Sequence, residues 1–177
     1  MGISHYLKMV NDKLIDDKVI KLFSAKNLVF IATLMKDGSP QLSPVWANCE
    51  DGFILVNTAE GRIKHKNILR DPRVAVSVTS NDNPLDMTTI RGTVIEIIPD
   101  YQYHHADKLT QQYMGRSNYP FKQPDEKRII FTTIPRIVVI SRGLSFEVTE
   151  TATRGSRKIF LCFILPSAVF TKIKPSS

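Results

Sequence analysis

Basic side chains gather where a helix is expected to begin, in the segment 57–67 (NTAEGRIKHKN). A helix N-terminus exposes unpaired N–H groups and a partial positive charge, so Arg62 and Lys64 at this place would complete a cradle for a phosphate group. Arginine offers a bidentate fork and lysine a point charge. From the spacing alone, a solvated basic helix face is the better interpretation. Cations at a helix start are, however, unfavourable unless an anion compensates them.

A second chemically suggestive segment is QLSPVW at positions 41–46. Pro44 cannot donate to a strand ladder, so its strand either bulges there or lies at a sheet edge. The freed N–H and C=O groups around Val45 would suit the polar edge of a flat heterocycle, with Trp46 packed nearby. The alternative is purely structural, with Trp46 in the core and with Gln41 and Ser43 facing solvent.

Other catalytic patterns are absent or weak. Asp100 and His104 have metal-ligand spacing on a predicted helix, together with His105 and Asp107, but no third ligand follows at a suitable distance. A solvated helix face accounts for these four residues, and we expect no metal. The sequence contains no GxSxG elbow, Walker loop or GxGxxG fingerprint.

The elements that position these residues are mostly strands. The acidic pair Asp16 and Asp17 starts a short helix before Lys26. The run at 28–35 is apolar on both faces and predicts a strand buried on both sides. Further strands are predicted from 41 and at 53–58, 74–79, 87–98, 128–140 and 158–165, with a helix at 100–114 that ends at Gly115. Six or more strands with short helices predict a mainly β protein, a closed or nearly closed antiparallel barrel.

Composition is that of an ordinary globular protein. The chain has 177 residues, 42% hydrophobic and 23% charged, which predicts one domain. The strand pattern loosens beyond Gly143, so we expect a core at 16–142 and a C-terminal extension at 143–177. Two cysteines without a CxxC motif favour a reduced intracellular protein. We found no signal peptide and no apolar run long enough to span a membrane, so we expect a cytoplasmic address without a membrane partner.

The net charge of +7 raises three classes of partner, nucleic acids, acidic membranes and phosphorylated small molecules. Aromatic residues are not interleaved with the basic ones as base stacking requires, so we expect no nucleic-acid partner. The basic segment at 57–67 then points to a phosphorylated small molecule.

Several segments between 28 and 138 resemble a known family in both content and order. They are ATLMKDGSPQLSPVW, NTAEGRIKHKNILRDPRVAVSV, IRGTVIEI and YMGRSNYPF followed by EKRIIF. Together they resemble the pyridoxamine-phosphate-oxidase-like (PPOX class) flavin-binding split barrels, and within them the deazaflavin-dependent oxidoreductases. The most specific stretch is K-x-x-N-x-x-x-D-P-R in the second segment. The resemblance implies an antiparallel, Greek-key-like FMN-binding split barrel.

The resemblance also assigns expected roles to residues. The cofactor phosphate would be bound by Arg62 and Lys64 with Asn67 nearby, and the strand 41–46 would lie along the ring system. Asn57 and Thr58 match positions near the ribityl chain. Relatives are homodimers with active sites at the subunit interface, so residues of a second copy would complete each site.

The implied reaction is hydride transfer between the reduced cofactor and a small organic acceptor, with no side chain needed as acid or base. The segment YMGRSNYPF is closer to the deazaflavin group, which ranks coenzyme F420 first and FMN second as cofactor. A non-catalytic protein that only binds such a cofactor is the third alternative. Substrate specificity would lie in loops such as 80–87 and 113–125.

Overall fold

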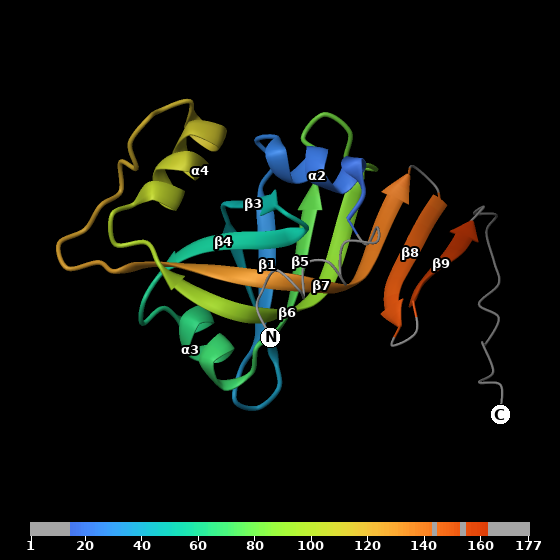
Figure 1. Ribbon diagram of the computed structural model, residues 1–177, viewed down its shortest axis with the longest axis horizontal. Helices are drawn as coiled ribbons and strands as arrows, with labels where there is room; N and C mark the ends of the chain where they lie inside the picture. The colour runs from blue at the N-terminus through green and yellow to red at the C-terminus, as the bar shows by residue number, and fades with distance from the viewer. Residues whose placement is uncertain (1–14, 143–144, 153–154, 163–177) are drawn as a thin grey trace.

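The computed structural model describes residues 15–142, 145–152 and 155–162, and it contains one antiparallel sheet with short helices around it (Figure 1). The described elements are, in chain order, α2 (Asp17–Ser24), β1 (Val29–Leu34), β2 (Pro40–Val45), β3 (Ala47–Glu50), β4 (Phe53–Ala59), α3 (Ile63–Arg70), β5 (Arg73–Thr79), β6 (Met87–Pro99), α4 (His104–Met114), β7 (Arg128–Arg142), β8 (Ser145–Ala152) and β9 (Gly155–Cys162). This confirms the prediction of a mainly β protein.

The sheet is curled into a barrel. Its strand order is β2-β1-β5-β6-β7-β4-β3, and every pair is antiparallel. The two ends of this path, β2 and β3, follow each other in the chain with only Trp46 between them. One residue therefore joins the two edges of the sheet. The hairpin β8–β9 continues from the far half of β7 and projects away from the barrel (Figure 1).

Alternating strand residues fill the barrel. Val74, Val76 and Val78 of β5 are buried, as their alternation predicts. Helix α2 begins at Asp17, and the side chain of the preceding Asp16 caps it by accepting a hydrogen bond from the Val19 N–H. The helix buries its apolar face against the core. The expected helix, barrel strands and core thus agree with the structure in this part of the chain.

The strand predicted at 28–35 is buried on one face only. Val29, Ile31 and Thr33 point into the barrel, whereas Phe30 is 39% exposed. The prediction of burial on both sides is wrong for a single copy, because Leu28 and Phe30 are 44% and 39% exposed on the outer face. Pro44 lies in β2, at an end of the strand order, and the β1–β2 register runs without a shift. Of the two explanations for Pro44, the edge position is therefore correct and the bulge is not.

Strand β6 is bent by two register shifts against β7. One lies at Gly92, opposite Pro135, and the other skips Ile95. At Gly92 an added Cβ would lie 2.5 Å from the carbonyl oxygen of Ile134, so only glycine fits this close approach. The predicted break of the strand at Gly92 is thereby explained.

Several elements differ from the prediction, among them β3, which was not foreseen as a strand separate from β2. Helix α4 begins at His104 and not at Asp100, although it ends at Gly115, which has φ +69°, as expected. Strand β8 was not foreseen. Strand β9 covers Gly155–Cys162, earlier than the predicted 158–165, of which 163–165 lies outside the described residues. No helix of the described part is long and apolar enough to cross a membrane.

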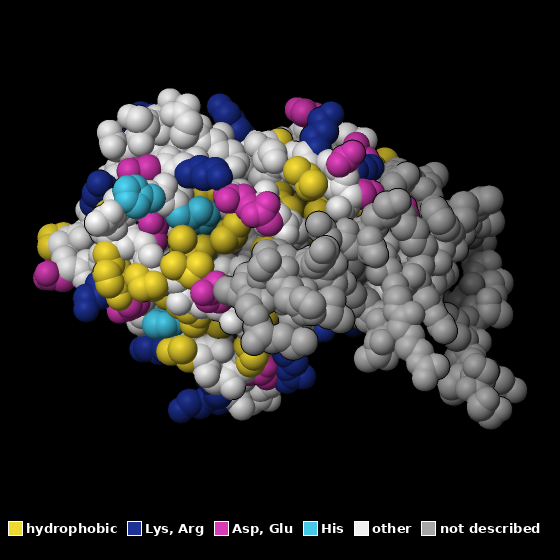
Figure 2. Space-filling model, viewed as in Figure 1, with side chains coloured by type: hydrophobic (Ala, Val, Ile, Leu, Met, Phe, Trp, Pro, Cys, Tyr) yellow, Lys and Arg dark blue, Asp and Glu magenta, His cyan; other side chains and the backbone are white. Residues whose placement is uncertain are grey.

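The outer face of β4, β6 and β7 carries an apolar groove, seen as the cluster of hydrophobic side chains in Figure 2. Its walls include Leu55, Ile95 and Ile98, and its rim includes Glu50 and Glu96. An acidic rim does not suit a phosphate, so this groove differs in kind from the site described next.

Candidate functional site

A cavity of about 280 Å³ opens beside the junction of β2 and β3, where the two edges of the sheet meet. It is also bordered by the end of β4, the start of α3, the loop 115–127 and the start of β7. The lining residues are Leu28, Pro44, Val45, Trp46, Asn57, Thr58, Lys64, Tyr119, Phe121 and Arg128. Predicted site residues from three separate segments, at 44–46, 57–58 and 64, are thus brought together in one place.

Aromatic rings form one wall of the cavity around Trp46. The Trp46 ring stacks on Tyr113, with centroids 5.2 Å apart and planes 7° from parallel. Tyr119 meets it edge-on at 6.4 Å, and Phe121 lies at 6.3 Å. The Tyr113 hydroxyl lies 3.0 Å from the carbonyl oxygens of both Asn27 and Ala47 and donates its one hydrogen to either of them, which holds the stack in position. Flat, apolar walls of this kind are suited to a flat heterocycle.

Lys64 brings a positive charge to the cavity without a counter-ion. Burial lowers its pKa, and the charges of Arg62 and Arg128 lower the pKa further. In the described part of the chain the Lys64 ammonium forms no hydrogen bond and no ion pair. Helix α3 starts here with no acidic residue in its first turn. Lys64, Arg62 and Arg128 repel one another, and the positive end of the α3 dipole repels them too. A bound anion would relieve this repulsion, so the place fits an anion.

Arg128 is the second cation of the cavity, and it is held firmly. Its side chain is 11% exposed, and its Nε donates to Asn57 Oδ1 at 2.7 Å. Its Nη1 donates to Glu126 Oε1 at 2.9 Å and to the Tyr119 hydroxyl at 3.2 Å. The guanidinium carbon lies 4.8 Å from the Tyr119 ring centroid, within cation–π range.

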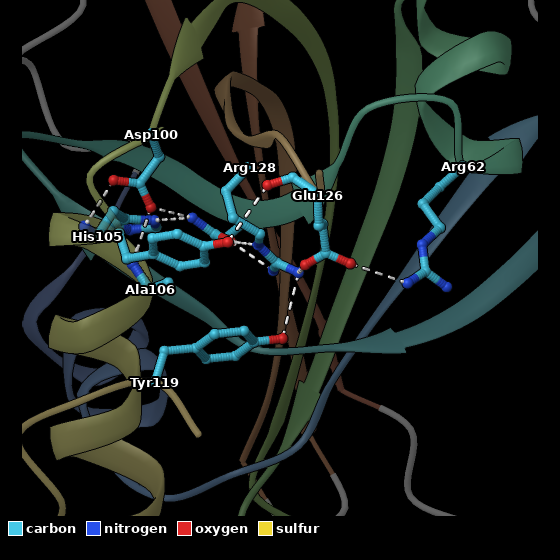
Figure 3. A network of polar contacts seen from close by, with 9 residues as sticks. Arg62, Asp100, His105, Ala106, Tyr119, Glu126 and Arg128 are labelled. Atoms are coloured by element: carbon cyan, nitrogen blue, oxygen red, sulfur yellow. Dashed lines mark hydrogen bonds and ion pairs between the residues drawn. The ribbon is translucent and has the colours of Figure 1, made fainter. Parts of the chain in front are cut away.

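A buried polar network extends from Arg128 through Asp100 to His105 (Figure 3). Asn57 Nδ2 donates to Asp100 Oδ2 at 2.7 Å and lies 3.3 Å from His105 Nδ1. The Asp100 carboxylate also accepts the backbone N–H groups of His105 and Ala106, which begins α4. The Asn57 amide therefore uses its donors toward α4 and its oxygen toward Arg128.

His105 belongs to the same network. Its Nε2 lies 2.9 Å from Asn48 Oδ1, so a neutral ring with the proton on Nε2 satisfies both of its neighbours. Burial lowers the pKa of His105, although the carboxylates of Asp100 and Glu50 oppose this. The expectation of a solvated helix face at 100–107 is wrong for Asp100 and His105, which are buried, because α4 packs this face on the barrel end.

Four predicted site residues lie outside the cavity lining. Gln41 Nε2 donates to Ser43 Oγ at 2.9 Å, and both residues lie farther along β2. Asn67 is buried and donates to Thr33 Oγ1 at 3.0 Å, so it fastens α3 to β1. The Arg62 side chain is 61% exposed and pairs with Glu126 at 3.2 Å.

Sequence reasoning missed Leu28, Tyr119, Phe121 and Arg128 as lining residues. The last three lie in the family-like segments YMGRSNYPF and EKRIIF, which supplied the signal without an assignment to individual residues. The loop 113–125 was expected to influence specificity, and two of the three lie in it.

A family model described as pyridoxamine 5'-phosphate oxidase matches residues 15–136. The chain belongs to the pyridoxamine 5'-phosphate oxidase family. The match covers the barrel from α2 to the middle of β7, including every residue that lines the cavity. The fold is therefore that of the flavin-binding split barrels, as the resemblance of the sequence segments implied.

Solved structures of this pyridoxamine 5'-phosphate oxidase fold include an F420 reductase that is 27% identical, with a TM-score of 0.63 over 70% of this chain and 98% of that one. A conserved hypothetical protein from Mycobacterium tuberculosis is 22% identical, with a TM-score of 0.60 over 75% and 88% of the two chains. A related FMN-binding protein from Nostoc punctiforme is 12% identical, with a TM-score of 0.57 over 90% and 94%. The latter two show the fold alone.

Proposed function

We propose that this chain is an oxidoreductase that binds a phosphorylated deazaflavin, coenzyme F420, in the cavity beside Trp46 and Lys64. The observation that carries the proposal is the half-buried Lys64 ammonium, which has no counter-ion in the described residues and faces the same cavity as the aromatic wall. A cation without an anion beside a flat apolar wall fits a ligand with a phosphate and a planar ring. FMN is the alternative cofactor.

Within this proposal each group of residues has a separate task. Lys64 binds the phosphate. Arg128 lines the same cavity, its position is fixed by the hydrogen bond to Asn57, and it adds a second positive charge for the ligand. Trp46 and Tyr119 hold the ring and exclude water from it. The bound cofactor supplies hydride transfer to or from a small organic molecule, so no side chain is assigned as acid or base.

We further infer that the functional unit is a homodimer. The cavity of about 280 Å³ is small for an entire cofactor, since ligand pockets usually measure about 300–1000 Å³. Two of its lining residues, Leu28 and Pro44, are exposed and continue into Phe30 and Leu42, which are 39% and 62% exposed on the outer face of β1 and β2. A second copy on this apolar face would cover it and complete the site.

The choice of F420 over FMN rests on likeness and has a direct test. The F420 reductase among the similar structures favours the deazaflavin. Purified protein is titrated with F420, FMN and riboflavin, and ligand fluorescence is followed. We expect micromolar or tighter binding of F420, weaker binding of FMN, and still weaker binding of riboflavin, which lacks the phosphate. Binding of FMN alone would establish the alternative, and binding of neither phosphorylated compound would refute the proposal.

A non-catalytic cofactor-binding protein remains the alternative from another functional class, since a fold does not by itself imply turnover. It predicts tight binding with no oxidation of the reduced cofactor in the presence of any of a broad set of quinones, enones and nitro compounds. Oxidation of the reduced cofactor that depends on one of these acceptors would dismiss it.

A further inference from the structure

Glu126 lies between two guanidinium groups at the edge of the cavity (Figure 3). Its Oε1 accepts from Arg128 at 2.9 Å and its Oε2 from Arg62 at 3.2 Å, and its side chain is 9% exposed. Its backbone is anchored as well, because its carbonyl oxygen accepts from the Tyr103 hydroxyl at 3.2 Å. The residue before it, Asp125, has φ +60°, a conformation that a non-glycine residue adopts at some cost. These backbone features fix the position of the Glu126 carboxylate between the two arginines.

The two arginines are held very differently. Arg128 is 11% exposed and is also bonded to Asn57 and Tyr119, so it stays in place. Arg62 is 61% exposed, and Glu126 is its only side-chain partner within the described ranges. Ion pairs open to solvent are weak, whereas an arginine–phosphate contact is charge-assisted and can be bidentate. Arg62 can therefore leave Glu126 for a stronger anion.

The charges of the cluster also match such an exchange. Arg62, Lys64 and Arg128 carry three positive charges and Glu126 one negative charge, which leaves two positive charges uncompensated. Burial raises the pKa of Glu126, but the hydrogen bonds and charges of Arg128 and Arg62 outweigh burial and hold that pKa below its usual value. Glu126 is accordingly ionised at neutral pH. The phosphate monoester of FMN, the alternative cofactor, carries about −1.5 to −2 charges at pH 7 and would balance the remainder, which is why FMN is the ligand of the tests below.

We infer that Glu126 is an internal counter-anion that holds Arg62 away from the cavity, and that a ligand phosphate bound at Lys64 takes Arg62 from it. The inference rests on the proposed function and deepens it, because it explains why Arg62 is outside the cavity lining although it was expected at the phosphate. Glu126 competes with the ligand for Arg62. It thereby lowers the affinity for all anions and selects for those with enough charge to displace it.

The test replaces Glu126 by glutamine, which keeps the shape and removes the charge. We expect Glu126→Gln to bind FMN about three- to tenfold more tightly than the wild type. The change removes the weak ion pair that competes for Arg62, and it removes the repulsion between Glu126 and the phosphate. Its affinity for riboflavin should change less than twofold. Weaker or unchanged FMN binding would show that Glu126 only positions the arginines and would overturn the inference.

The matched control is Asp125→Asn, which removes a negative charge one residue away from Glu126. The Asp125 side chain contacts neither arginine in the described residues. Asparagine tolerates the positive φ, so the loop is retained. We expect less than a twofold change in FMN affinity. An increase equal to that of Glu126→Gln would mean that general charge, and not the contact with Arg62, sets the affinity.

The role of Arg62 is tested by the double variant Arg62→Gln/Glu126→Gln. The gain of the single Glu126→Gln change should disappear in it. Persistence of the gain would overturn the inference. If Glu126→Gln does not fold, side-chain ¹⁵N NMR of the wild type answers the same question. The Arg62 Nε signal should shift on saturation with FMN, and an unmoved signal would refute the exchange.

Failure of the proposed function would look different. If the wild type binds neither FMN nor F420, inorganic pyrophosphate is used as the probe in a thermal-shift assay of the same variants. A larger pyrophosphate-induced rise in Tm for Glu126→Gln than for the wild type would support the exchange at a general anion site. An equal rise, or none in either protein, would overturn it.

Discussion

Replacing Lys64 by alanine removes the one cation that borders the cavity without a counter-ion in the described residues. A hydrogen bond to a charged group contributes about 1.5–3 kcal/mol, which corresponds to roughly a ten- to hundredfold loss of affinity for a phosphorylated cofactor. Riboflavin, without a phosphate, should bind both proteins equally. The Tm of the unliganded protein should not fall, because the change removes repulsion by Arg62 and Arg128 and alanine favours a helix.

The assay is fluorescence titration with FMN, F420 and riboflavin at one ionic strength, with Lys66→Ala as the matched control. Lys66 is an exposed lysine of the same helix that borders a different groove with Lys36 and Arg70. Its replacement should leave affinity within twofold. Unchanged affinity of Lys64→Ala, or a large loss in Lys66→Ala alone, would refute the reasoning and place the phosphate at the groove near Arg70.

Three further predictions concern the barrel and the network. Asn57→Leu should lower the free energy of unfolding by about 2–4 kcal/mol in urea denaturation, because Arg128 and Asp100 each lose a buried hydrogen-bond partner; a loss below about 1 kcal/mol would contradict this. The pKa of His105 is lowered in the folded protein, so its contribution to stability is complete above its unfolded pKa near 6.5 and is lost as pH falls toward the folded pKa. Urea unfolding at pH 7.5 and 5.5 should show this loss in the wild type and less of it in His105→Gln, and equal losses would assign the effect to other groups. Gly92→Ala should cost about 1–3 kcal/mol by forcing its Cβ against Ile134, and an unchanged Tm would show that the strand can shift there.

The barrel could be predicted from the sequence because its strands carry their own signals. Val74, Val76 and Val78 alternate, and the turn at Asp51-Gly52 has both residues at positive φ, as such turns require. Gly115 ends α4 in the left-handed conformation that glycine adopts freely. Each of these features depends on residues close together in the sequence, so it can be predicted without knowledge of the tertiary structure.

What the sequence could not provide was contact between distant segments. The network of Asn57, Asp100, His105 and Arg128 joins residues up to 71 positions apart, and no spacing along the chain signals it. The same holds for Asp100 and His105, whose polar side chains look like a solvated helix face until α4 is placed on the barrel. Burial of polar groups depends on packing, and packing is not a local property.

The three residues predicted to bind the phosphate show what a sequence segment can and cannot predict. Lys64 lies in the cavity, as family likeness and helix-start electrostatics suggested. Asn67, in the same helix, is instead buried and donates a hydrogen bond to Thr33 of β1. Arg62 is turned toward Glu126, a residue 64 positions away in the chain. A family-like segment therefore locates the neighbourhood of a site, but the partners of each side chain decide which of its residues face the cavity.

The central claim, a phosphorylated flavin-type cofactor held between Lys64 and the aromatic wall, is tested most directly by a crystal structure of the protein with F420 or FMN bound. The account predicts the phosphate within hydrogen-bond distance of Lys64 Nζ and the ring system against Trp46 or Tyr119. A cofactor phosphate bound away from Lys64, or a cavity left empty at saturating concentrations of both cofactors, would contradict it.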